Sequence, residues 1–188
     1  MPGKTTGKLL EHAQLQYGFV TSEDARDLGV DSAQMPSMAS RSLLEHHARG
    51  IYRMPLVPPT QLDPYMEAVL LTNRKGVLSH ATALDLLELC DVNPSAIHLT
   101  VPKAFRTARP LPDSLRLHKK PIEASAVGMF EGIPMVTAAE AIAGGIEMGL
   151  GWRLIDQAIT TARSRGLISK QTATDLGSLR AAAHSGHA

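Results

Sequence analysis

The sequence predicts an α+β protein of two domains, and three features of its 188 residues indicate this. Residues 19–54 carry two short helical patterns joined by a glycine turn and followed by a hairpin pattern. Four prolines between positions 55 and 64 resist regular structure and mark a connection between domains. Helical and alternating apolar patterns follow, so we expect a C-terminal α/β domain with a small sheet and several helices. We place the domains at residues 1–55 and 63–183 and expect residues 184–188 to be disordered.

The N-terminal pattern begins with a helix over residues 4–17 that ends at Gly18. A short helix over residues 22–28 follows, because Thr21 or Ser22 can accept a hydrogen bond from a free backbone N–H of its first turn. Gly29 ends this helix, since glycine adopts the left-handed conformation without a Cβ penalty. The next helical pattern starts immediately afterwards, which is the arrangement of a helix-turn-helix.

The second helix of this motif contains Pro36. Proline inside a helix removes a hydrogen bond and costs roughly 3 kcal/mol. Either residues 31–34 form a turn and the helix proper begins near Met35, or the helix begins at Asp31 and bends at the proline. We favour the first arrangement, because proline is common at the first helical position. Met35 and Met38 then fall on the buried side of the helix.

Residues 43–46 and 51–54 flank the segment 47–50 and predict a hairpin with Gly50 at the position that needs a positive φ. This hairpin is the wing of a winged helix-turn-helix domain, which offers its second helix to the major groove of DNA. Side chains of that helix read base edges, and basic groups of the wing hold phosphates. The predicted DNA-binding residues are Lys4, Lys8, Ser32, Gln34, Ser37, Arg41, His46, His47, Arg49 and Arg53. One short helix with few cations offers little contact, so we expect two copies on an inverted repeat.

The run TSEDARDLGV at residues 21–30, the helix leading into Leu44, and the closing residues 49–53 (RGIYR) resemble the N-terminal domain of the AbiEi family of antitoxins. This family belongs to type IV toxin–antitoxin systems. Weaker resemblance continues through residues 77–84 and 132–137. Where family members commonly carry arginine in the second helix, this chain has Pro36 and Ser37. The resemblance implies an antitoxin that represses its own operon and counters a nucleotidyltransferase-type toxin through its C-terminal domain.

The C-terminal pattern predicts a mixed set of helices and strands. Helices are expected at residues 64–74, 81–89, 138–146, 152–165 and 170–182, with Ser79, Thr137 and Ser169 as caps of the second, third and fifth. Residues 96–101 and 115–118 alternate as strands, and residues 127–130 and 133–136 form a hairpin around Glu131–Gly132. A short extended piece is expected from Val77. These segments give a sheet of three or four strands.

Positive charge gathers in the middle of the chain although the net charge is only +1. Residues 103–120 hold six cations against one carboxylate, Asp113. Such a segment produces a local positive field that suits an acidic or nucleotide-bearing partner, or extends a phosphate-binding surface. A solvated loop is the alternative. We predict an antitoxin surface made of Lys103, Arg106, Arg109, Arg116, Lys119 and Lys120.

Catalytic and metal-binding signatures are absent from the sequence. The eight histidines form no HExxH or other paired metal spacing, and no Gly-x-Ser-x-Gly is present. His80 makes at most a weak constellation with Asp85 and Glu88, so we expect an ordinary surface there. Cys90 cannot form an internal disulfide because it is the single cysteine, and we expect it in the core. We therefore expect a protein that is not an enzyme and has no metal or cofactor.

No stretch of 18 apolar residues occurs, and the N-terminus has no apolar signal core. We expect a cytoplasmic protein with no membrane partner. Two other functions remain open from the sequence. One is a stand-alone winged-helix transcription factor whose C-terminal domain senses a ligand or dimerises; the other is an enzyme that uses the winged helix for protein contact.

Overall fold

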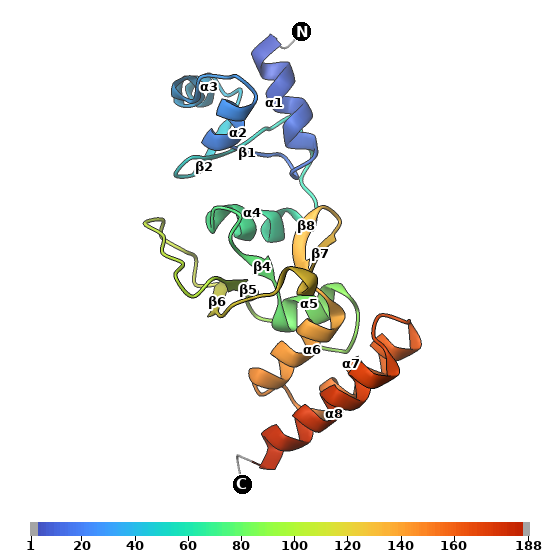
Figure 1. Cartoon of the computed structure of the whole chain (residues 1–188). Helices are drawn as coiled ribbons and strands as arrows, with labels where there is room; N and C mark the ends of the chain where they lie inside the picture. The colour runs from blue at the N-terminus through green and yellow to red at the C-terminus, as the bar shows by residue number, and fades with distance from the viewer. Residues whose placement is uncertain (1–3, 186–188) are drawn as a thin grey trace. The chain divides into compact units, whose positions relative to one another are not determined.

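The computed structural model describes residues 4–185 and confirms a mixed α+β fold (Figure 1). The chain forms two compact units. Unit 1 contains residues 1–74 together with 107–110, and unit 2 contains residues 75–106 together with 111–188. The sequence placed the domain boundary near residues 55–62, whereas the contacts assign the following helix and its C-terminal end to unit 1. Four residues of the basic segment also belong to unit 1.

Unit 1 has the element order of a winged helix-turn-helix. Its elements are α1 (Lys4–Gln14), β1 (Phe19–Thr21), α2 (Ser22–Asp27), a 3-10 turn (Ser32–Gln34), α3 (Met35–Ser40), β2 (Glu45–Ala48), β3 (Ile51–Arg53) and α4 (Asp63–Leu71). The three strands form an antiparallel sheet in the order β1-β3-β2. Strand β1 was not predicted, because its three residues are too short for an alternating pattern and run directly into the cap of α2.

Helix α3 begins at Met35 and not at Asp31, so Pro36 does not bend it. Residues 32–34 form the 3-10 turn, with the Asp31 carboxylate accepting a hydrogen bond from the Ala33 N–H, and Pro36 lies in the first turn of α3. The favoured prediction is thus confirmed, and the proline breaks no helical hydrogen bond there. Met35 and Met38 are buried with Leu9 and Leu44 in the core of this unit.

Unit 2 is built around a five-stranded mixed sheet, one or two strands more than predicted. Its strands are β4 (Val77–Leu78), β5 (Ile97–Val101), β6 (Leu115–Lys119), β7 (Val127–Phe130) and β8 (Ile133–Val136), in the order β6-β5-β4-β8-β7. Strand β5 pairs parallel with β6 and antiparallel with β4, and β7 and β8 form the predicted hairpin. Two residues of β4 join the two halves of the sheet.

Four helices complete unit 2: α5 (His80–Leu86), α6 (Ala138–Glu147), α7 (Trp152–Ser164) and α8 (Lys170–Ser185). Helix α6 packs against α5, α7 and α8, and Leu84, Ile142, Ile155 and Ala158 are fully buried there. Cys90 is buried as expected. Helix α8 continues through residues 184 and 185, which were predicted to be disordered, while the rest of that predicted tail, residues 186–188, lies outside the described residues. Within residues 4–185, none of the helices has both the length and the apolar character needed to cross a membrane.

Candidate functional site

The outer face of α3 and the turn before it bring together the four residues predicted to read bases. Gln34 and Ser37 are exposed, Ser32 is half-buried, and the exposed Arg41 is the C-terminal cap of the helix. The opposite face of α3 is occupied by buried methionines. Helix α3 is thus a short helix with a buried apolar side and a polar outer side.

The wing is a hairpin whose tip is Arg49–Gly50. Gly50 has φ +71°, as the sequence predicted, and its carbonyl accepts a hydrogen bond from the Ser22 N–H at the start of α2. Arg49 and His46 are exposed. The turn therefore holds the Arg49 backbone against the helix-turn-helix while its side chain remains in solvent, where a phosphate could meet it.

Two predicted wing contacts are engaged inside unit 1. The Arg53 guanidinium donates to the Val57 carbonyl at 3.0 Å and to the Asp63 carboxylate at 3.1 Å, and its side chain is only 15% exposed. The structure corrects the phosphate role predicted for Arg53, because this arginine fastens β3 to the start of α4. His47 places Nε2 2.8 Å from the Glu67 carboxylate, which competes with any phosphate.

Lysines of α1 complete the predicted DNA-binding set. Lys4 is exposed, and Lys8 donates from Nζ to the Leu28 carbonyl at 3.1 Å. Leu28 lies in the turn between α2 and α3. Lys8 therefore stabilises the helix-turn-helix at its turn, in addition to bringing a positive charge to that side of the unit.

The six cations of the predicted antitoxin surface are divided between the two units. Arg109 belongs to unit 1. Lys120 lies between Glu140 and Glu147, at 2.9 and 3.0 Å from their carboxylates. Burial alone would lower the pKa of Lys120, but these two partners raise it above its usual range. The exposed cations of the segment in unit 2 are Lys103, Arg106, Arg116 and Lys119.

Three histidines of unit 2 form a stack that sequence analysis missed. His80 lies with its ring centroid 3.5 Å from that of His118, and His98 Nδ1 lies 2.9 Å from His118 Nε2. We expected an ordinary surface at His80, but its side chain is 1% exposed. The Ser79 hydroxyl accepts from Thr100 and lies 2.8 Å from His80 Nδ1. The strand pattern contained a signal for this cluster, because both His98 and His118 alternate with apolar residues in their strands. His98 shares a face of β5 with Thr100, and Thr100 is paired with His118 of β6.

The pKa of all three imidazoles is lowered, which favours the neutral form. Burial lowers the pKa of His80 to about 3, and the neighbouring His118, Lys120 and His98 add to this effect. Burial is also the main cause that lowers the pKa of His98 and of His118. Within the described residues His80 Nε2 is buried without a hydrogen-bond partner, and no group of His, Cys, Asp or Glu is arranged to hold a metal ion. The three rings therefore pack against one another as polar groups inside unit 2.

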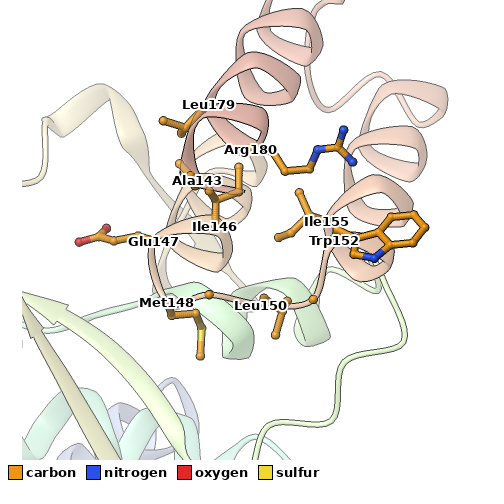
Figure 2. Close-up of a pocket in the computed structure, with 12 residues that line it drawn as sticks. Ala143, Ile146, Glu147, Met148, Leu150, Trp152, Ile155, Leu179 and Arg180 are labelled. Carbon is orange, nitrogen blue, oxygen red and sulfur yellow. The ribbon is translucent and has the colours of Figure 1, made fainter. Parts of the chain in front are cut away.

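A hollow of about 780 Å³ lies among α6, α7 and α8 (Figure 2). Ile146 and Ile155 contribute apolar lining, and Leu179 and Trp152 are 47% and 57% exposed beside it. Figure 2 shows that the Arg180 side chain extends from α8 toward the helix that carries Ile155 and Trp152. Its guanidinium is paired with the Asp156 carboxylate at 2.6 Å.

Comparison with known proteins concerns the fold alone. No protein-family model and no curated protein matches this sequence. The crystal structure of the RV2827C protein from Mycobacterium tuberculosis is similar, with a TM-score of 0.51 and 15% sequence identity. The match covers 97% of this chain and 78% of that chain, so it spans both units.

Proposed function

We propose that this protein is the antitoxin of a type IV, AbiE-like toxin–antitoxin system. It binds inverted-repeat operator DNA to repress its own operon, and it neutralises a nucleotidyltransferase-type toxin through its C-terminal domain. The observation that carries the DNA-binding half is the exposed polar face of α3 beside a wing whose tip presents Arg49. The antitoxin half is supported by the resemblance of residues 21–53 to AbiEi antitoxins.

The two parts of the interface divide the work of recognition. Gln34 and Ser37 are short or neutral side chains that donate and accept hydrogen bonds, which suits base edges in the major groove. The exposed Arg41 at the end of α3 joins them in reading bases, and the exposed positive charge of Arg49 at the wing tip suits a phosphate. Because α3 has only six residues, one copy contacts a few base pairs, and two copies on an inverted repeat supply the remaining affinity and specificity.

The experiment for this proposal combines DNA binding with toxin rescue. Binding of the full chain to the DNA upstream of its own gene is measured by fluorescence anisotropy and footprinting, beside a shuffled sequence of equal length. The chain is then co-expressed with the protein encoded by the adjacent reading frame, and growth is followed. Footprints over two half-sites and restored growth support the proposal. Equal affinity for shuffled DNA contradicts the repressor role, and unrelieved toxicity contradicts the antitoxin role.

The DNA-reading assignment of α3 has its own matched variants. Gln34→Ala with Ser37→Ala should reduce the preference for operator over shuffled DNA, because base contacts are lost while phosphate contacts remain. Thr174→Ala with Ser178→Ala, two exposed positions on α8, serve as the control. A double variant that keeps full preference for the operator would assign base reading to another element.

A second function is favoured by the hollow in unit 2. A stand-alone transcription factor that senses a ligand needs a binding pocket, and pockets of several hundred Å³ with apolar walls and few polar groups hold small molecules. The hollow among α6, α7 and α8 has this size and lining. Under this alternative, the adjacent reading frame encodes no toxin, and a small apolar molecule shifts operator affinity. Toxin rescue therefore separates the two functions.

A further inference from the structure

Arg109 connects three acceptors of unit 1 through one guanidinium group. Its Nε donates to the Arg49 carbonyl at 2.9 Å, and its Nη1 donates to the Leu70 carbonyl at 2.9 Å and to Asn73 Oδ1 at 2.6 Å. Leu70 lies in the last turn of α4, and Asn73 lies two residues beyond the end of that helix, where its N–H also donates to the Leu70 carbonyl at 3.0 Å. The last carbonyls of a helix lack intrahelical partners and carry partial negative charge, so a guanidinium is well placed there.

The wing tip is therefore held at two successive carbonyl groups. Arg109 binds the carbonyl of Arg49, and the Ser22 N–H binds the carbonyl of Gly50. A Cβ added at Gly50 would lie 3.5 Å from Ser22 Oγ and 3.6 Å from Arg109 Nη2, so both partners pack closely on the turn. These two hydrogen bonds restrain the backbone of the turn from which the Arg49 side chain extends.

We infer that Arg109 is a positioning residue for DNA binding, which fastens the wing tip to α4 so that Arg49 points at a DNA phosphate. This inference rests on the proposed DNA-binding function. Under this inference, Arg109 is no longer part of the predicted antitoxin surface. Its Nε and Nη1 hydrogens are already donated to Arg49, Leu70 and Asn73 and so do not meet a partner.

The chemistry of the contact explains why arginine stands here. A guanidinium offers several donors in a rigid fork, whereas a lysine ammonium is a compact charge on a flexible stem and cannot span the same acceptors. Burial, followed by the repulsion of Arg49, lowers the pKa of Arg109. Two like charges are thus held near each other by the hydrogen bonds to neutral acceptors. These hydrogen bonds offset the repulsion between the Arg49 and Arg109 guanidinium groups.

The test is a double-mutant cycle between Arg109→Gln and Arg49→Ala in the full chain, with operator DNA and salt titration. If Arg109 acts through Arg49, either single change weakens binding roughly fivefold at 0.15 M salt, the contribution of one phosphate contact, and the double change is no weaker than Arg49→Ala alone. Arg109→Lys should not restore affinity. Arg163→Gln, an exposed arginine of α7, is the control.

Additive losses, with the salt slope reduced by about one for each change, would show that Arg109 itself binds phosphate and would overturn the inference. Unchanged affinity in Arg109→Gln would overturn it as well. A milder variant, Asn73→Gly, removes one acceptor and suits the positive φ of +54° at that position, so it keeps the test available if Arg109→Gln does not fold.

A readout without DNA separates this inference from the proposed function. In the free protein, Arg109→Gln should shift the amide NMR signals of Gly50 and Ile51 and speed exchange of the Ser22 N–H, which donates to the wing tip. If the wild-type chain binds no DNA, the proposed function is wrong, and so is the DNA-binding role of Arg109. The fastening of the wing tip by Arg109 is then still tested by these NMR signals. Unchanged wing signals would overturn the fastening itself.

Discussion

The imidazole of His80 lies flat on that of His118, with ring centroids 3.5 Å apart and planes inclined by 14°. Gly144 of α6 also lies against the His80 ring, where an added Cβ would be only 2.9 Å from His80 Cδ2. The His80 ring therefore packs against both a second imidazole and the backbone of a helix. The arrangement disfavours protonation of both rings, because two stacked imidazolium groups would repel each other.

The first prediction is a loss of stability in mild acid. Above the ordinary histidine pKa of 6.5 both the folded and unfolded chains hold His80 neutral. Below it the unfolded chain binds a proton that the folded chain refuses until about pH 3, so the free energy of unfolding falls with pH across this window. From pH 7.5 to 5.0, His80 alone accounts for roughly 2 kcal/mol. Urea unfolding at both pH values measures it.

His80→Asn provides the comparison for this pH dependence. Asparagine tolerates the left-handed backbone of position 80, which has φ +54°, but it does not titrate. The variant should be less stable at pH 7.5 and should lose less stability on acidification. His46→Gln, at an exposed position of the wing, is the control. Equal slopes for wild type and His80→Asn would show that His80 is not the titrating group.

The second prediction concerns two helical glycines with opposite surroundings. Gly144→Ala should destabilise the protein by roughly 1–3 kcal/mol, because the new Cβ overpacks a ring that His118 prevents from moving. Gly177→Ala in α8 should instead stabilise it by about 0.5–1 kcal/mol, since no atom lies within 4 Å of the added Cβ and alanine favours helix. Thermal unfolding of both variants tests the contrast. Stabilisation by both changes would mean that the His80 ring can move aside.

Local patterns predicted the elements of this fold well where the cause is local. The hairpin of β7 and β8 was predicted to the residue because Glu131–Gly132 is a turn between two apolar runs. The start of α3 followed from the preference of proline for a first helical turn. Thr21 was one of two predicted caps, and it forms a capping box with Asp24.

Contacts between distant parts of the chain were not predictable from such patterns. Arg109 meets the Arg49 carbonyl 60 positions away, and the charge pattern around Arg109 suggested only a basic loop. His80 was expected at an ordinary surface because it makes at most a weak constellation with Asp85 and Glu88, whereas it packs against Gly144, which lies more than 60 positions away on α6. The predicted antitoxin residues were grouped because they are close in the sequence. Sequence proximity could not show that Lys120 forms ion pairs with Glu140 and Glu147.

The third prediction tests the buried carboxylate of unit 1. Asp24 is 5% exposed and accepts hydrogen bonds from the Thr21 N–H at 2.8 Å and from Arg74 Nη2 at 2.6 Å. Burial raises its pKa, but the hydrogen bonds from Thr21, Arg74 and Gln16 outweigh burial and keep the pKa below 3.8. Asp24→Asn should cost roughly 2 kcal/mol, whereas Asp27→Asn, which is exposed, should cost little.

The pH dependence of Asp24 has a definite sign. Its contribution is complete above pH 3.8 and is lost as the pH falls through the lowered pKa of the folded state. Wild type and Asp24→Asn should therefore approach each other in stability below this pH. A constant difference between them down to acid unfolding would indicate that packing, not ionisation, makes Asp24 stabilising.

The fourth prediction isolates the wing. Arg49→Ala should weaken binding to operator and shuffled DNA by a similar factor and lower the salt slope by about one, because a phosphate contact is independent of sequence. Arg163→Ala, on α7 and equally exposed, should change neither quantity. Arg53→Ala is expected to act differently, by lowering stability, since its guanidinium holds Asp63. Unchanged affinity for Arg49→Ala across several DNAs would refute the assignment of the wing.

The last prediction concerns the cations of unit 2 that remain available for a toxin. Arg109 and Lys120 are engaged by their own neighbours, so the test variant changes Arg106, Arg116 and Lys119 to glutamine and leaves both untouched. A positive field of this kind attracts an acidic or nucleotide-bearing surface, and it weakens when its charges are removed. Toxin rescue should therefore fall while operator binding stays intact. The control changes Arg153, Arg163 and Lys170, which removes the same number and kinds of charge from α7 and α8. Rescue that survives in the test variant would mean that these three cations are solvated groups with no role in rescue. Rescue lost in both variants would mean that overall charge, rather than this surface, matters.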